Sequence, residues 1–82
     1  MAVATLVEEV HQAEDIIQRI EAEYGAGGRI DRTDGLSVEY ADWRFNLRSS
    51  NTEPVLRLNV EARGDRGLLL QMTNELLVII RS

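Results

Sequence analysis

The first part of the chain carries apolar residues at helical spacing. From residue 4 to residue 23 they recur every three or four positions, which places them on one face of an amphipathic helix. Thr5 and Glu8 have the spacing of a capping box near its start. Three glycines follow and are predicted to end the helix, because glycine accepts a left-handed conformation. The apolar stripe consists of Val3, Leu6, Val7, Val10, Ala13, Ile17, Ile20 and Tyr24, and the glycines are Gly25, Gly27 and Gly28.

After these glycines the pattern changes to a period of two residues, which is typical of strands with one buried face. Ile30 lies in a short strand, and Asp34-Gly35 is a hairpin turn signal. Each strand has one apolar face, so the sheet is predicted to be antiparallel with helices on one side. The three longer strands are predicted over residues 36–41, 43–48 and 55–62.

Residues 66–80 are predicted to form a second helix with Asp65 as its N-cap. Leu70 and Leu77 lie near a second apolar face of this helix, which packs on the first helix or on something outside this chain. The order helix, four strands, helix predicts a single domain over residues 1–82. Its class is α+β, with a two-layer architecture in which two helices flank a four-stranded antiparallel sheet. The main stripe of the second helix consists of Leu68, Leu69, Met72, Leu76, Ile79 and Ile80.

Composition narrows the possible chemistry. Of the 82 residues, 44% are apolar and 28% are charged, as in a globular protein. There is no cysteine, which excludes disulfides, thiolate zinc sites and thiol nucleophiles. His11 is the only histidine, so a metal cage of histidines is excluded, and His11 is predicted to be solvated or to cap a helix. No membrane-length apolar run and no signal-peptide pattern occurs, so a cytoplasmic location is expected.

Charge is distributed unevenly along the chain. Nine arginines stand against 14 acidic residues, a net charge of −5, which disfavours binding to a nucleic-acid backbone. Residues 1–23 contain six acidic residues and one arginine. Residues 43–58 contain three arginines and one glutamate, so this stretch is the expected place for a bound anion.

The segment 48–54, Arg-Ser-Ser-Asn-Thr-Glu-Pro, joins two predicted strands and contains no glycine. It carries instead a guanidinium, three hydroxyls and an amide, all of which donate hydrogen bonds. A phosphate monoester offers three terminal oxygens and a charge of about −1.5 to −2 at neutral pH. A guanidinium can pair with two of these oxygens, and the hydroxyls and amide can serve the others. The loop is therefore a candidate phosphate site.

Each of these residues also has a purely structural interpretation. Serine, threonine and asparagine form turns by bonding to their own backbone, so the loop composition alone leaves both interpretations open. Arg57 lies on the face of its strand away from the core, where it binds an anion or pairs with Glu39 or Glu61 across strands. Trp43 falls on the apolar face and is predicted to belong to the core.

Three sequence segments carry a resemblance to the α-D-phosphohexomutase superfamily. The loop motif looks like the phosphate loop in the C-terminal, fourth domain of these enzymes, and the resemblance extends from about Ile30 to the end of the chain. Ser-Asn-Thr-Glu-Pro is similar to the phosphomannomutase/phosphoglucomutase branch, since the phosphoglucosamine mutase branch typically has glycine in place of Asn51. The segments are Asp34-Gly35-Leu-Ser-Val-Glu, Trp43, and Arg48-Ser-Ser-Asn-Thr-Glu-Pro-Val-Leu-Arg-Leu-Asn-Val-Glu-Ala62.

The resemblance implies a TATA-binding-protein-like fold and a role within a longer, four-domain enzyme that interconverts hexose 6-phosphate and hexose 1-phosphate through a bisphosphosugar. It implies phosphosugar and the remaining domains as partners, with no nucleic acid and no membrane. Magnesium and a bisphosphohexose activator are implied for the parent enzyme, with no cofactor, metal ligand or catalytic residue in this domain. The implied phosphate contacts are Arg48, Ser50, Asn51 and Thr52, with Ser49 and Arg57 as possible additions.

Two other classes of function compete with this interpretation. A stand-alone protein-interaction or regulatory module without a ligand fits the same two-layer architecture, because fold does not determine function. An RNA-binding sheet is disfavoured by the net negative charge and by the lack of aromatic residues interleaved with basic ones.

Overall fold

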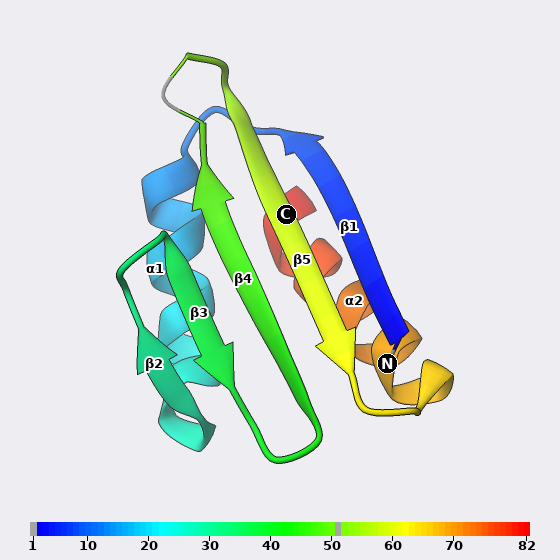
Figure 1. Cartoon of the computed structure of the whole chain (residues 1–82). Coiled ribbons are helices and arrows are strands. Elements are labelled where there is room, and N and C mark those ends of the chain that lie inside the picture. Colours follow the sequence, from blue (N-terminus) through cyan, green and yellow to red (C-terminus); the bar gives the residue numbers. More distant parts are fainter. Residues whose placement is uncertain (1, 51) are drawn as a thin grey trace.

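The computed structural model describes residues 2–50 and 52–82 and contains one antiparallel sheet with the strand order β1-β5-β4-β3-β2. Both helices lie on the same side of this sheet, so its other face is open (Figure 1). The predicted two-layer α+β architecture is confirmed, with five strands in place of four. The elements are β1 (Ala2–Glu9), α1 (Ala13–Tyr24), a 3-10 turn (Gly25–Gly27), β2 (Arg29–Asp31), β3 (Leu36–Glu39), β4 (Trp43–Ser49), β5 (Val55–Ala62) and α2 (Arg66–Arg81).

The additional strand is β1, and the prediction of a helix over residues 4–23 is wrong in its first part. Ala2–Glu9 pairs residue by residue with Ala62–Val55 of β5, and its side chains alternate between half-buried and exposed. Thr5 therefore caps no helix and donates instead to Asn59 Oδ1 on the neighbouring strand at 3.0 Å. The physical reason is tertiary, because β5 gains a full ladder of backbone hydrogen bonds that outweighs the local helical spacing. The helix begins only at Ala13.

The glycines after α1 act differently from the prediction. Gly25 has right-handed helical backbone angles, with φ at −67°, so no left-handed residue ends this helix. Gly28 is instead required by close packing. A Cβ on Gly28 would lie 2.6 Å from Val38 Cγ1 and 2.9 Å from the carbonyl oxygen of Glu39. These glycines therefore let the chain turn tightly against β3 as it enters the sheet.

The remaining elements follow the sequence prediction closely. Four strands and α2 are present, and Asp65 caps α2 by accepting a hydrogen bond from the Leu68 backbone N–H at 2.9 Å. Leu77 is buried in the core, whereas Leu70 is 63% exposed. His11 is exposed, and the N-cap position of α1 belongs to Gln12, which makes no side-chain capping bond, so the capping alternative for His11 is wrong.

The core fills the space between the sheet and the two helices. Trp43 lies half-buried against it, with its ring stacked on Tyr40 at 4.6 Å between ring centroids. Neither helix in the described part of the chain is long and apolar enough to span a membrane. The largest fully buried side chains are Phe45, Ile20, Leu36, Leu47, Leu56, Leu58, Leu76, Val38 and Val60.

Tyr24 joins three elements at one end of this core. Its ring meets Phe45 edge-to-face at 6.0 Å, and its hydroxyl donates to Glu75 Oε1 on α2 at 3.1 Å. Its backbone carbonyl accepts a hydrogen bond from the Tyr40 hydroxyl. Burial, with a smaller contribution from Glu75, raises the pKa of Tyr24 to about 12.

Leu58→Ala is expected to lower the free energy of unfolding by about 2–5 kcal/mol, because it opens a cavity at a side chain that is 1% exposed. A domain of this size has a small stability margin, so the variant should be substantially unfolded. Val78→Ala on α2 is the control, since Val78 is 69% exposed and its loss should change stability by less than about 0.5 kcal/mol. Urea unfolding followed by circular dichroism measures both, and equal effects would contradict the assigned core.

Stability should fall as the pH rises from 10 to 12. The pKa of Tyr24 is about 12 in the folded chain against about 10 when unfolded, so its contribution is complete below pH 10 and is lost through this window. Tyr24→Phe should flatten the fall, leaving the smaller slope due to Tyr40, whose pKa is also raised by burial. Urea unfolding at pH 8, 10 and 11 measures the free energy of unfolding of the unmodified chain and of Tyr24→Phe. If this free energy fell equally with pH in the two proteins, the prediction would be refuted.

Candidate functional site

The candidate loop lies at one end of the sheet, between the end of β4 and the start of β5 (Figure 1). Backbone hydrogen bonds fix its base. The Ser50 N–H donates to the carbonyl of Val55 at 3.2 Å, and the Val10 N–H, just after β1, donates to the carbonyl of Pro54 at 2.8 Å. Asn51 lies outside the described residues. The loop is thus anchored both to its own hairpin and to the segment that leads into α1.

Arg48 and Arg57 stand directly opposite each other in the register of β4 and β5, on the open face of the sheet. Like charges in this position repel each other. The alternative in which Arg57 pairs with Glu39 or Glu61 is wrong, because Glu61 pairs with Arg44 at 3.5 Å and Glu39 forms no ion pair with Arg57. Among the described residues, no carboxylate forms an ion pair with Arg57. The register therefore places two arginines on neighbouring strands beside the loop, and Arg57 has no ion-pair partner among the described residues.

The hydroxyls of Ser50 and Thr52 contact each other within the loop. Ser50 Oγ and Thr52 Oγ1 are 3.4 Å apart, and the Thr52 N–H donates to Ser50 Oγ at 3.3 Å. This local bonding is what the turn-forming interpretation predicts, while both exposed hydroxyls keep capacity for another partner. Ser49 is the last residue of β4 and follows Arg48 directly. Its Cβ therefore points to the opposite face of the strand.

A groove of about 520 Å³ brings most of the candidate residues together. Arg48, Ser49, Ser50 and Arg57 all line it, whereas Thr52 reaches it only through its contact with Ser50. The groove also contains two acidic side chains, so its walls are balanced in charge. The complete lining is Glu14, Ile17, Asp34, Gly35, Arg48, Ser49, Ser50, Val55 and Arg57.

Asp34 lines the groove, although the sequence indicated it only as a turn residue and not as a site residue. Its Oδ2 accepts a hydrogen bond from Arg48 Nη1 at 2.9 Å. The next residue, Gly35, has a positive φ of 73°, and a Cβ there would lie 2.6 Å from the Leu47 carbonyl oxygen. The Asp-Gly turn signal predicted the turn itself. Its position against Arg48 follows from the pairing of β3 with β4, which the turn signal does not determine.

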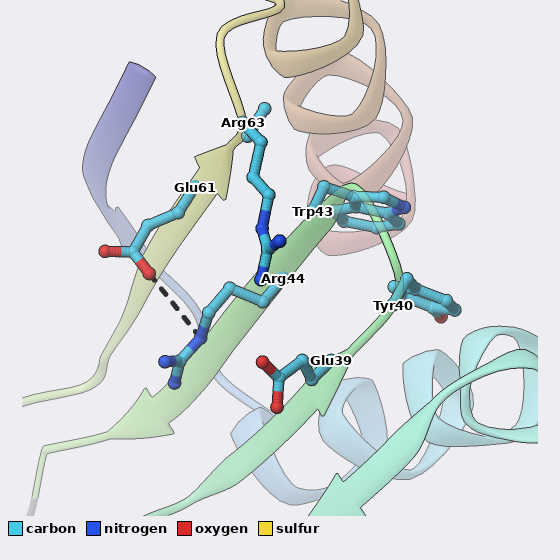
Figure 2. Close-up of a pocket in the computed structure, with 7 residues that line it drawn as sticks. Glu39, Tyr40, Trp43, Arg44, Glu61 and Arg63 are labelled. Atoms are coloured by element: carbon cyan, nitrogen blue, oxygen red, sulfur yellow. Dashed lines mark ion pairs between the residues drawn. The ribbon is translucent and has the colours of Figure 1, made fainter. Parts of the chain in front are cut away.

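A second pocket, of about 330 Å³, lies at the opposite end of β4 and β5. Figure 2 shows Arg44 on its floor between Glu39 and Glu61, with the rings of Tyr40 and Trp43 to one side. The guanidinium of Arg44 is engaged in the ion pair with Glu61, and the ring of Trp43 stacks on the rings of Tyr40 and Phe45. Arg63 also lines this pocket and makes no ion pair among the described residues, so the pocket differs from the candidate loop chiefly in lacking the serine and threonine hydroxyls.

The described residues contain no cluster of three or more His, Cys, Asp or Glu side chains that could hold a metal ion. The chemistry of the candidate loop is accordingly that of hydrogen-bond donors and two cations. Such a set recognises an oxyanion by charge and geometry.

Comparisons with known proteins identify the family of this chain. Residues 2–77 match the family described as phosphoglucomutase/phosphomannomutase, C-terminal domain. A phosphomannomutase of Salmonella montevideo is 58% identical over 67 residues, which cover 80% of this chain and 15% of that protein. A phosphomannomutase of Escherichia coli is 54% identical over 70 residues, covering 84% of this chain and 15% of that protein.

Phosphohexose mutases of Xanthomonas campestris pv. campestris are 51% identical over 73 residues, covering 88% of this chain and 16% of their own length. The chain thus spans about 15% of the length of the curated relatives it matches. The resemblance seen in the loop motif is confirmed over most of the chain, including β1, where the sequence had offered no family signal. The chain belongs to the phosphoglucomutase/phosphomannomutase family, as its C-terminal domain.

Proposed function

We propose that this chain binds the phosphate of a phosphosugar, as the C-terminal domain of a phosphomannomutase/phosphoglucomutase. The observation that carries the proposal is the facing pair Arg48 and Arg57 beside the donor-rich loop. The family membership and the names of the relatives support the same activity, the interconversion of hexose 6-phosphate and hexose 1-phosphate through a bisphosphosugar.

In the proposed site, the guanidinium of Arg48 pairs with two phosphate oxygens, and the hydroxyls of Ser50 and Thr52 serve the remaining one together with the Asn51 amide. Ser49 and Arg57 are additional contacts. A dianion between two opposed guanidinium groups removes their repulsion, so binding is favoured even at an open surface. Guanidinium, hydroxyl and amide donors at this site recognise the phosphate group itself, and the site is therefore proposed to accept the 1-phosphate and the 6-phosphate alike.

Within the parent enzyme, the domain holds the phosphate that is not reacting. Binding energy at this remote group positions the substrate and favours closure over it, which assists the chemical step elsewhere. This chain is proposed to form a single domain over residues 1–82 and to contribute no catalytic residue. It is therefore expected to be inactive alone. Magnesium and a bisphosphohexose activator are proposed to act on other domains of the parent, in the cytoplasm.

The alternative is a protein-interaction module without a ligand. It is favoured by large apolar side chains on the surface, since Val3 and Val7 on β1 and Leu70 and Val78 on α2 are all more than half exposed. Such a surface serves equally well as a contact for the parent's other domains. The Arg48 experiment below separates the two functions, because a partner surface around Leu70 does not need the guanidinium.

Inorganic phosphate and mannose 1-phosphate should shift the backbone amide signals of residues 48–52 alike, with a dissociation constant near 1 mM, or about −4 kcal/mol. Arg48→Ala should abolish these shifts, because it removes the bidentate contact. Arg44→Ala is the matched control, as it removes the same side chain from the same face of β4 at the pocket of Figure 2. A folded chain whose loop amides do not respond to either ligand would refute phosphate binding.

Phosphate binding should weaken as the pH falls from 8 to 5, since the second pKa of a phosphate monoester is about 6 and the monoanion forms below it. Sulfate keeps its double negative charge across this range and should show no such change. The measurement is again the amide titration, at constant ionic strength. If both anions weakened in parallel, the pH effect would come from the protein rather than from the phosphate, contrary to the proposal.

A further inference from the structure

Asp34 supplies the one carboxylate that contacts the candidate cations among the described residues. Its Oδ2 accepts from Arg48 Nη1 at 2.9 Å, and no other acidic side chain forms an ion pair with Arg48 or Arg57. The contact uses a single nitrogen of the guanidinium, which has five N–H donors in all. In the chain as described, Arg48 is thus partly neutralised before any ligand arrives.

The backbone holds this carboxylate in place. The carbonyl of Asp34 accepts a hydrogen bond from Asn46 Nδ2 at 2.8 Å, and the same Nδ2 donates to Ser37 Oγ at 2.9 Å. Gly35 lies so close to β4 that no Cβ would fit, as its hypothetical Cβ is 2.6 Å from the Cβ of Arg48. Aspartate has a short side chain, so with this backbone fixed its carboxylate stays near the guanidinium.

The ion pair itself is weak. The Asp34 and Arg48 side chains are 72% and 41% exposed, and a surface pair of this kind contributes about 0–1 kcal/mol. A phosphate dianion that forms two charge-assisted hydrogen bonds competes successfully for the same guanidinium. Asp34 nevertheless remains a wall of the groove, so the bound phosphate lies beside a fixed negative charge.

We propose that Asp34 acts as an internal counter-ion that competes with phosphate for Arg48 and sets the affinity of the site low. This inference rests on the proposed phosphate binding. In the empty site, Asp34 offsets the repulsion between Arg48 and Arg57. When phosphate binds, the ligand replaces the Asp34 carboxylate as the partner of Arg48. The carboxylate then repels the bound phosphate, which favours release of the ligand.

The test is Asp34→Asn in the 82-residue chain, titrated with inorganic phosphate at pH 8 and followed by the amide signals of Arg48 and Ser50. Asparagine keeps the size of the side chain and suits the turn, while it removes the charge. The dissociation constant should fall about threefold to tenfold at low ionic strength. The difference from the unmodified chain should shrink in about 0.5 M salt, because screening weakens a Coulombic effect and leaves a conformational one unchanged.

Glu14→Gln is the matched control, since Glu14 lines the same groove and makes no ion pair with Arg48. Direct competition predicts that Asp34→Asn raises the affinity for phosphate clearly more than Glu14→Gln does. Equal gains, an unchanged affinity or weaker binding in Asp34→Asn would overturn the inference, and weaker binding would make Asp34 an orienting residue for Arg48. In each of these cases the unmodified chain still binds phosphate. If neither the unmodified chain nor Asp34→Asn responds, both this inference and the proposed function fail.

Discussion

The register of β4 against β5 is the constraint on which the rest of this structure depends. Side chains alternate along a strand, so one register decides both faces of the sheet at once. On the inner face it places Phe45 opposite Val60 and Leu47 opposite Leu58. On the open face it places Arg48 opposite Arg57. A shift of β5 by one residue would move its apolar side chains to the open face and Arg57 to the inner face. Hydrophobic packing therefore enforces an arrangement of charges that is unfavourable by itself.

Packing also explains why the candidate site is at the end of the sheet. The inner face is covered by α1 and α2, and the far end of β4 carries the pocket that is lined by stacked rings and by the Arg44–Glu61 pair. At the loop end of β4 and β5, arginine and serine side chains line the groove and take no part in the core. The stacked rings and the candidate loop thus lie at opposite ends of the same two strands.

Much of the fold could be predicted from alternation and turn chemistry, because β2 to β5 and α2 carry patterns that fit one period only. The segment 3–10 fits both periods, so its local pattern also favours a helix, and its pairing with β5 is not visible in the local sequence. The loop motif identified the candidate site and the family. The Asp34–Arg48 contact and the lack of a carboxylate for Arg57 depend on how distant segments align, which a single sequence does not encode in any local pattern.

The hydrogen bond from Val10 to Pro54 has a mechanical consequence. It joins the residue after β1 to the candidate loop. All of β1 also pairs with β5, and the first residue of β5 follows that loop. A force applied to Ala2 along the strand would pull β1 parallel to β5. Many hydrogen bonds between the two strands would have to break at the same time before β1 could move. The loop and the leading strand are consequently linked by a continuous set of backbone hydrogen bonds, and we expect a displacement of β1 to displace the loop as well.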